Sequence, residues 1–494
     1  QSPFIAAHAY AIPTMNRLSS RCMLAALAGL GLAGCAAVGP DYVPPVPAAP
    51  AAWRQLDPAA LPAVRGETPD ALAHWWRQLD DAMLSGLIED ALRASPDLES
   101  AQARLRESRA RRGVADAARY PALDATASAS RTRSSEQTGG GLTRNLFSAG
   151  FDASWELDVF GGVRRGVEAA QADVEAAQAG LDDTRVSLAA EVATNYVEVR
   201  SLQQRLDIAR ANLDAQSETL QLTEWRAQAG LVNDQDVEQA RSNREQTRAQ
   251  IPLLQASLVE AEHRLDVLLG LTPGTLHPRL ASALALPSLP ARIAVGIPAD
   301  TLRQRPDVRA AERRLAAETA RLGAAEAARY PSFSLSGSIG LDALTLGGLG
   351  NGGAAASSLL AGITAPLFDG GRLRAQAEAQ DAVRAQAAVA YRQAVLAALQ
   401  DAENALSALA RSREREQALA AAATAARNAA DLARQRYGAG LIDFQSVLDT
   451  ERTRLSVEDG LASARADGVQ ALVRLYKALG GGWSPQAASA KDPA

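Results

Sequence analysis

The sequence has few of the residues that build reactive or metal-binding sites. Its 494 residues include two cysteines, Cys22 and Cys35, and four histidines: His8, His74, His263 and His277. These six residues form no cluster with metal-ligand spacing, so they do not favour a metal site, a disulfide scaffold or a Cys–His nucleophile. The net charge of −5 argues against nucleic-acid binding.

Large side chains are also scarce. Aromatic residues make up 4% of the chain, and alanine supplies much of the 47% hydrophobic share. Such a composition disfavours thick cores and favours long helices that pack closely through small residues. With 22% charged residues the chain is typical of folded rather than disordered proteins.

The N-terminal region has the pattern of a bacterial export signal. A short basic stretch, residues 15–21, precedes sixteen residues, 23–38, that carry no charge. This run is too short to span a bilayer as a helix and has the form of a signal-peptide core. Residues 1–14 precede Met15, and we expect residues 1–34 to be upstream sequence plus signal peptide.

The signal ends in Leu32-Ala33-Gly34-Cys35, which resembles a bacterial lipoprotein box. Cleavage there would leave a lipid-modified Cys35 as the first residue. An ordinary cleavage site beside a chance cysteine is the alternative. Alanine at position 36 resembles the residue type found there in lipoproteins that are sorted to the outer membrane. Residues 35–70 are rich in proline and alanine, which predicts a lipidated extended arm.

The rest of the chain contains an internal duplication. Five short motifs recur in the same order, four of them 210 residues apart and the Gly-Gly pair 209 apart. The motifs begin at Ser95, Ala117, Gly161, Ala229 and Leu269, and their partners at Arg305, Ala327, Gly370, Ala439 and Leu479. We therefore predict two structural repeats, 71–270 and 299–480, joined by an equatorial linker, 271–298, and followed by a tail, 481–494.

Each repeat is predicted to hold a helix, a pair of strands and a helical hairpin. Proline at positions 96 and 306 suits the first turn of a helix. Segments 123–129, 151–159, 333–339 and 359–367 alternate between apolar and polar residues, which indicates strands with two unlike faces. The strand pairs fall within 121–160 and 331–368, with loops at 131–144 and 341–358. A small soluble sheet is one reading, and strands that cross an outer membrane as part of a barrel are the other.

Two proline-free segments, 163–229 and 372–437, predict helices roughly 100 Å long at about 1.5 Å per residue. Return helices are expected over 231–270 and 441–479, after glycine turns at Gly230 and Gly440. Apolar residues recur at heptad spacing in 163–229 and in both return segments, as in a coiled coil. The heptad positions include Val167, Val174, Leu181 and Leu188, then Val192, Val199, Leu206, Leu213 and Leu220, and in the second repeat Leu441, Leu448, Leu455, Ala462, Val469 and Tyr476.

Four strands cannot close a barrel, and an open sheet edge is not viable in lipid. Several chains must therefore contribute strands to one barrel. Alternating serines, Ser332 to Ser338, suit a wet lumen.

The motif Arg305-Pro306-Asp307-Val308, followed by residues 327–338, resembles a hallmark of the outer-membrane efflux factors, the TolC-like channel family, in its lipoprotein branch. The resemblance covers residues 70–482. It implies a mixed α+β membrane protein: a homotrimer with a 12-strand outer-membrane β-barrel, four strands per chain, on a long periplasmic α-helical barrel.

The resemblance also implies a function and a location. The chain would be the passive exit duct of a tripartite efflux system, lipid-anchored in the outer membrane and extending into the periplasm of a Gram-negative bacterium. Its partners would be a periplasmic adaptor and an inner-membrane pump, usually of the resistance-nodulation-division type. No cofactor is expected besides the covalent lipid on Cys35.

The family's gate residues map onto the return helix of the second repeat. Asp449 and Arg452 match the aspartate and arginine with which the family holds the closed tip, and Asp443 is a weaker candidate. Gln445 stands where the family often has a bulky apolar residue, which indicates a more polar or looser gate. A solvated helix pair is the alternative for Asp449 and Arg452, and dipole compensation is the alternative for Asp443.

The turns themselves are candidates for adaptor contact. These residues are Gly230, Asn233, Asp234, Asp236 and Gly440. Polar capping of a helix start is the alternative for the three polar ones.

Two other functions compete with the channel. A coiled-coil lipoprotein that tethers or spaces the envelope would explain the heptads but not the four alternating segments. An enzyme is disfavoured because the sequence contains no histidine cluster, no phosphate-binding glycine loop followed by lysine and no nucleophile elbow. We expect small organic compounds as cargo, because Met83 is the one methionine after the signal and soft-metal transport is thereby disfavoured.

Overall fold

The fold is seen in a computed structural model that describes residues 37–46, 49–56, 63–64, 69–282, 284–290, 293–294 and 298–484. The expected signal peptide and Cys35 lie outside the described residues. The chain divides into two compact units. The strand unit comprises residues up to 43, 110–172 and 316–385, and the hairpin unit comprises 44–109, 173–315 and 386–494. Each unit contains parts of both repeats, so the compact units do not coincide with the duplicated halves.

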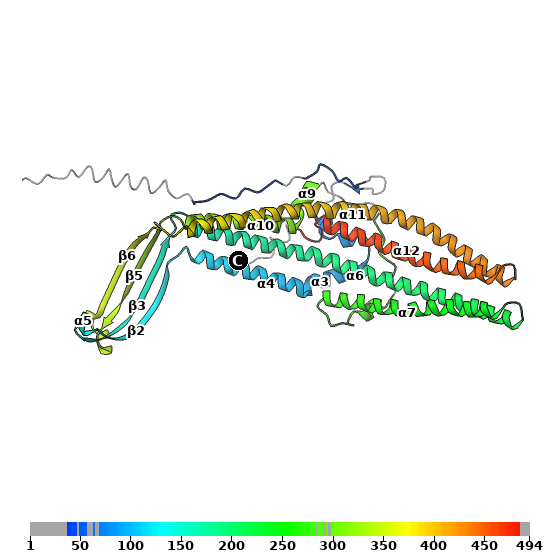
Figure 1. The fold of residues 1–494 in the computed structure, drawn as a ribbon, viewed down its shortest axis with the longest axis horizontal. Helices are drawn as coiled ribbons and strands as arrows, with labels where there is room; N and C mark the ends of the chain where they lie inside the picture. The colour runs from blue at the N-terminus through cyan, green and yellow to red at the C-terminus, as the bar shows by residue number, and fades with distance from the viewer. Residues whose placement is uncertain are drawn as a thin grey trace, which may run out of the picture. The chain divides into compact units, whose positions relative to one another are not determined.

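The strand unit holds one four-stranded antiparallel sheet in the order β2-β3-β5-β6 (Figure 1). Its strands are β2 (Ala122–Arg133), β3 (Thr143–Leu157), β5 (Ser332–Ala343) and β6 (Ala355–Thr364). The two predicted strand pairs therefore form two hairpins, and the pairing of β3 with β5 joins the repeats. Strands β2 and β6 are the edges of the sheet.

The strands differ in extent from those expected. Arg131, Thr132 and Arg133 continue the ladder opposite residues 143–145, although they were expected in a loop. Backbone pairing extends the hairpin there because it does not require apolar side chains. At the other edge β6 ends at Thr364, so Ala365 and Leu367 lie beyond the strand rather than on its apolar face.

The register places like side chains on the same face of the sheet. Phe151 pairs with Ile339, and Trp155 with Leu335, so these apolar residues share one face. On the opposite face Ser338 pairs with both Asp152 and Ser358. The apolar face is exposed in the single chain: Ile339 is 66% exposed and Leu359 80%. An apolar face of this extent requires an apolar environment.

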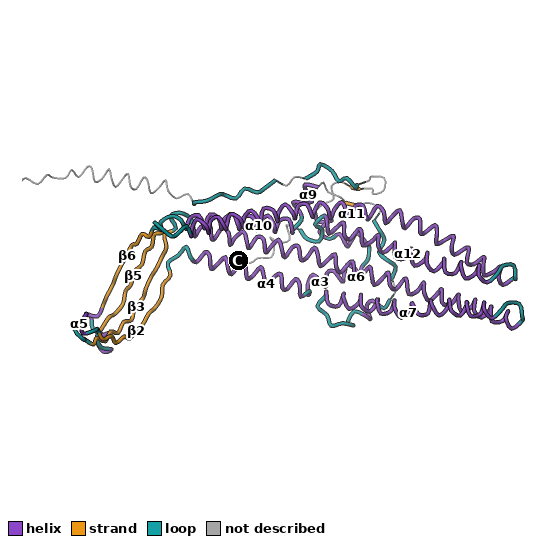
Figure 2. The backbone as a smooth tube through the Cα atoms, in the orientation of Figure 1, coloured by secondary structure: helices purple, strands orange, loops and turns teal. Residues whose placement is uncertain are grey.

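Two long helical hairpins follow from the predicted heptads (Figure 2). The first consists of α6 (Gly162–Gln228) and α7 (Asp234–Leu268), and the second of α11 (Arg372–Gly438) and α12 (Phe444–Ala478). Both long helices have 67 residues and both return helices have 35. Two 22-residue helices, α4 (Pro96–Ala117) and α10 (Pro306–Ala327), begin at the prolines identified in the sequence.

The remaining elements are short. They are β1 (Ala63–Val64), α2 (Pro69–Ala73), η1 (Trp75–Leu79), α3 (Ala82–Ala94), α5 (Glu136–Gly139), α8 (His277–Leu280), β4 (Ile293–Ala294), α9 (Pro298–Gln304), η2 (Leu346–Gly350) and η3 (Gly352–Ala354). Strand β1 pairs in parallel with β4, which belongs to the inter-repeat linker.

The core of the hairpin unit contains five of the chain's aromatic residues, among them Trp75 and Tyr476. Trp75 stacks on Tyr476 with ring centroids 5.3 Å apart, and the Tyr476 hydroxyl donates to Gln78 Oε1 at 2.7 Å. Heptad residues such as Val192 and Val469 are buried, as expected. Val174, Leu213 and Leu455 are only half-buried. Leu441 is 73% exposed because it lies in the turn before α12, not on the helix seam.

The two sheet faces give a test of which one contacts lipid. We expect Ile339→Arg to impair insertion, because a cation on the lipid-facing side of a barrel costs about 2–4 kcal/mol near the bilayer midplane. The amount of heat-modifiable protein in outer-membrane fractions measures insertion. Ser338→Arg, one residue away on the polar face, is the matched control. Equal insertion of the two variants would contradict the assignment of the faces.

Candidate gate and docking site

Both helical hairpins reverse through the same glycine turn. After α6 the amide of Leu231 donates to Arg226 O and that of Gly230 to Ala227 O, at 2.8 and 2.9 Å. The amides of Leu441 and Gly440 repeat this pattern after α11, each at 2.9 Å. This pair of backbone hydrogen bonds is the Schellman motif, which needs a residue in the left-handed backbone conformation. Gly230 and Gly440 supply it, with φ of 70° and 74°.

The polar residues after each turn cap the return helices. Asn233 accepts a hydrogen bond from the amide of Asp236 at 2.9 Å, at the start of α7. Asp443 does the same for α12, accepting from the amide of Ser446 at 2.9 Å and from its hydroxyl at 2.6 Å. These bonds from Ser446 lower the pKa of Asp443. Asp234 is exposed in the first turn of α7, where a carboxylate complements the helix dipole.

Three of the candidate gate residues, Gln445, Asp449 and Arg452, lie at exposed positions of α12. Gln445 donates to Asp449 Oδ1 at 3.0 Å, one helical turn away. Arg452 does not turn toward Asp449: its Nε donates to Asn243 Oδ1 on α7 at 3.1 Å. Arg452 therefore joins the second hairpin to the first, although 209 residues separate the two partners.

An apolar cluster behind the turns holds the two hairpins together. Tyr437 is its centre: it is 1% exposed, lies 5.7 Å from Phe444 and carries the Arg226 guanidinium 4.4 Å above its ring. The Arg226 side chain also donates to the Tyr437 carbonyl. Sequence reasoning missed these residues because Arg226 and Tyr437 belong to different repeats.

A row of buried polar contacts continues along the hairpins. The Thr219 hydroxyl contacts Glu451 Oε1 at 2.6 Å, and Asn212 donates to Glu458 Oε2 at 3.4 Å. Both pairs join α6 to α12, and the two pairs are seven residues apart on each helix. Burial raises the pKa of Glu451, which is 5% exposed, against the opposing effects of the Thr219 bond and of Arg434 and Arg454. Polar residues at heptad spacing were the available signal in the sequence, whereas the predicted heptads contain only apolar residues.

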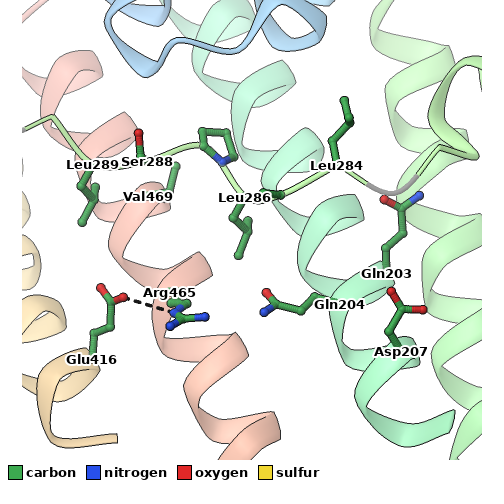
Figure 3. Close-up of a pocket in the computed structure, with 12 residues that line it drawn as sticks. Gln203, Gln204, Asp207, Leu284, Leu286, Ser288, Leu289, Glu416, Arg465 and Val469 are labelled. Carbon is green, nitrogen blue, oxygen red and sulfur yellow. Dashed lines mark hydrogen bonds and ion pairs between the residues drawn. The ribbon is translucent and has the colours of Figure 1, made fainter. Parts of the chain in front are cut away.

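A cavity of about 590 Å³ lies under the inter-repeat linker (Figure 3). Residues 284–289 cross over α6 and α12 there, and Leu286 and Leu289 pack near Val469. Arg465 donates to Glu416 at 3.3 Å across one side of it. The described lining contains no histidine or cysteine.

Other sites were sought in the described part of the chain. No group of three His, Cys, Asp or Glu residues there could hold a metal ion. None of the described helices has both the length and the apolar character needed to cross a membrane.

The family comparison agrees with this architecture. A family model described as outer membrane efflux protein matches the chain twice, at residues 87–271 and 297–481. The two matches correspond to the two repeats inferred from the motifs. The chain therefore belongs to the outer membrane efflux protein family.

Relatives match over nearly their full length. The chain is 33% identical to Nodulation protein T of Rhizobium leguminosarum bv. viciae over 474 residues, 95% of each chain. It is 34% identical to the pyoverdine export outer membrane protein OpmQ of Pseudomonas putida, covering 92% of this chain and 96% of that one.

Solved structures share the fold. The outer-membrane channel OprN matches with a TM-score of 0.85 and 39% identity, covering 91% of this chain and all of that chain. VceC of Vibrio cholerae matches with a TM-score of 0.77 and 28% identity, covering 83% and 99%. These findings confirm the TolC-like channel fold, with a helical and a β portion in each chain, and a function as an outer-membrane efflux channel that extends into the periplasm. The family and the fold are those of channels rather than enzymes.

The buried Glu451 predicts a pH dependence. A carboxyl whose pKa is raised in the folded state favours folding at low pH, and that contribution is lost as pH rises through the folded pKa. We expect Glu451→Gln, which keeps the shape without the charge, to be more stable than the wild type at pH 8. The difference in unfolding temperature should shrink toward pH 5. Glu238→Gln, an exposed acid on α7, is the control, and a pH-independent difference for Glu451→Gln would contradict the effect.

Proposed function

We propose that three copies of this chain form the channel. The argument rests on the sheet, whose edges β2 and β6 have no outer partner strand among the described residues. Unpaired backbone groups are not tolerated in lipid, so these edges must pair with other copies. Three chains supply 12 strands, enough for a barrel with an open lumen. The polar face with Ser338 and Asp152 then lines the lumen, and the face with Ile339 contacts lipid.

We further propose that the mature chain carries lipid on Cys35 and uses no other cofactor. The lipoprotein box in the sequence supports this modification. The anchor and the barrel would then both hold the protein in the outer membrane.

The channel would serve as the passive exit duct of a tripartite system. A periplasmic adaptor would contact the hairpin turns, and an inner-membrane pump, of the resistance-nodulation-division type, would deliver the cargo. Leu231 and Leu441 support docking at the turns, since their side chains are 67% and 73% exposed. The apolar cluster next to the turns, with Tyr437 at its centre, is buried. Gly230, Gly440, Asn233, Asp234 and Asp236 shape and surround this surface.

Small organic compounds are the proposed cargo. OpmQ is named for pyoverdine export, and another relative, 32% identical over 458 residues, is named as the outer membrane protein of a toluene efflux pump in Pseudomonas putida. A wide lumen without chemistry of its own suits such varied cargo.

The double variant Leu231→Asp/Leu441→Asp tests the docking proposal. We expect it to abolish complementation of a strain that lacks its own efflux channel, because charged turns cannot bury against an adaptor. Chemical cross-linking of the purified variant should still yield three-chain species. The control is Val114→Asp, an exposed apolar residue on α4 far from the turns in sequence. Full complementation by the turn variant would refute docking there, and absence of three-chain species in the wild type would refute the trimer.

We propose that Asp449, Arg452, Gln445 and Asp443 form the periplasmic gate. Arg452 would hold the hairpins together through Asn243, and Gln445 would orient Asp449. Three copies of Asp449 would form an acidic ring that favours cations. Asp443 would contribute by ending the turn and starting α12. A gate of this kind is polar rather than an apolar plug.

Removing the contact between the hairpins should open the gate. We expect Arg452→Ala to raise mean single-channel conductance several-fold in planar bilayers, because Asn243 loses its partner on α12. Asp449→Asn should instead lower the preference for cations over anions. Asp467→Asn, which removes an exposed acid from the same helix, is the control. Conductance unchanged in Arg452→Ala would rule out this gate.

A further inference from the structure

The first described residues of the N-terminal arm are bound by one buried arginine of the strand unit. Arg165, near the start of α6, has a side chain that is 6% exposed. Its Nε donates to Val38 O and its Nη2 to Gly39 O, both at 3.3 Å. Nη2 also contacts Asp41 Oδ1 at 2.6 Å, while Nη1 contacts Glu168 at 2.8 Å. Three of these four contacts are to the arm.

Glycines let the arm backbone approach the strand unit closely. A Cβ on Gly161 would lie 2.5 Å from the Cβ of Ala37, and a Cβ on Gly39 would lie 2.5 Å from the Cα of Gly323. Gly161 and Gly39 also have φ of 80° and 90°, which other residues rarely adopt. The amide of Val38 completes the contact by donating to Phe160 O at 3.0 Å.

The next residue of the arm is held by packing. The half-buried Tyr42 lies against Ala172 of α6 and Ala316 and Ala317 of α10. The small alanine side chains leave room for the ring. Residues 37–42 are therefore held by a backbone bond, a charged fork and an apolar contact in succession.

The contacts of Arg165 indicate that this site is built to be occupied by the arm. Without the arm, the Arg165 guanidinium would keep only Glu168 among the four partners described above. Undocking of the arm would therefore remove three of the four described hydrogen bonds of the guanidinium, and hydrogen bonds to a charged group are stronger than those between neutral groups. Asp41 is 90% exposed, so the pairing depends on the arm coming to the arginine rather than on a shared buried pocket.

We propose that Arg165, Gly161, Gly323 and the alanines under Tyr42 form a receptor for the peptide that follows the lipid-modified cysteine. We name it the arm cradle. At most about 7 Å of extended chain separates Cys35 from Ala37, so docking of the arm fixes where the lipid anchor leaves the strand unit. This inference rests on the proposed lipidation of Cys35.

Proteolysis of the arm tests the cradle. The Tyr42–Val43 bond is a chymotrypsin site, and cleavage there yields a chain that begins at Val43. We expect Arg165→Gln in the full-length, membrane-extracted protein to be cleaved about tenfold faster than the wild type, because cleavage follows the population of undocked arm. Arg165→Lys, which keeps the charge but loses the fork, should be intermediate.

Two further variants make the outcome decisive. Asp41→Lys alters the exposed arm rather than the fold and should also accelerate cleavage about tenfold by placing a cation beside Arg165. Glu168→Gln changes the partner of Arg165 that is not on the arm. Its cleavage rate should stay within about twofold of the wild-type rate. Wild-type cleavage rates in both Arg165→Gln and Asp41→Lys, with channel conductance intact, would overturn the cradle. The mass of the released fragment 35–42 separately reports the lipid: a fragment without acyl groups would refute lipidation and leave the cleavage rates to judge the docking.

Discussion

The requirement that every backbone hydrogen-bonding group in a membrane be paired governs this protein. The sheet β2-β3-β5-β6 satisfies it internally but leaves two edges open. A helical membrane protein can satisfy the requirement chain by chain, whereas a sheet must close. With the sheet completed by other copies, as proposed, assembly is a condition of insertion. The alternation of Ser338 and Ile339 gives the sheet one polar and one apolar face.

The helical hairpins follow a different constraint, which is length. Helices of 67 residues cannot be covered by one compact core, so they depend on seams that repeat every seven residues. Apolar residues supply most of this seam, and Asn212, Thr219, Glu451 and Glu458 interrupt it with buried polar contacts. Such contacts cost desolvation but permit few registers, so they align α12 with α6. The Arg452–Asn243 bond adds a cross-link between hairpins close to the turns.

Duplication explains why the two halves resemble each other in local detail. The Schellman turns after α6 and α11 have the same hydrogen bonds because Ala-Gly-Leu recurs at both places. Identical local sequence does not produce identical surroundings, however. Arg226 lies over Tyr437 of the other hairpin, and Asn233 and Asp443 cap equivalent helices with different side chains.

Local and periodic features were predictable from the sequence. The strand alternation, the helix lengths, the glycine turns and the repeat depend on residues near one another in the chain, and a period of two or seven is visible without coordinates. Strand ends were less predictable, as at Arg131–Arg133 and Leu367, because backbone pairing rather than side-chain type sets them.

Only the tertiary structure decided which residues meet. Arg452 bonds to Asn243 rather than to Asp449, and Arg165 binds Asp41 of the arm, 124 residues away in sequence. Where a side chain has several acceptors within reach, the burial of the groups and the distances between them determine which hydrogen bond forms. Burial and distance are set by packing between segments remote in the chain. For that reason the sequence by itself determined the class of protein and the shape of its elements, while the fold decided the partners of its charged residues.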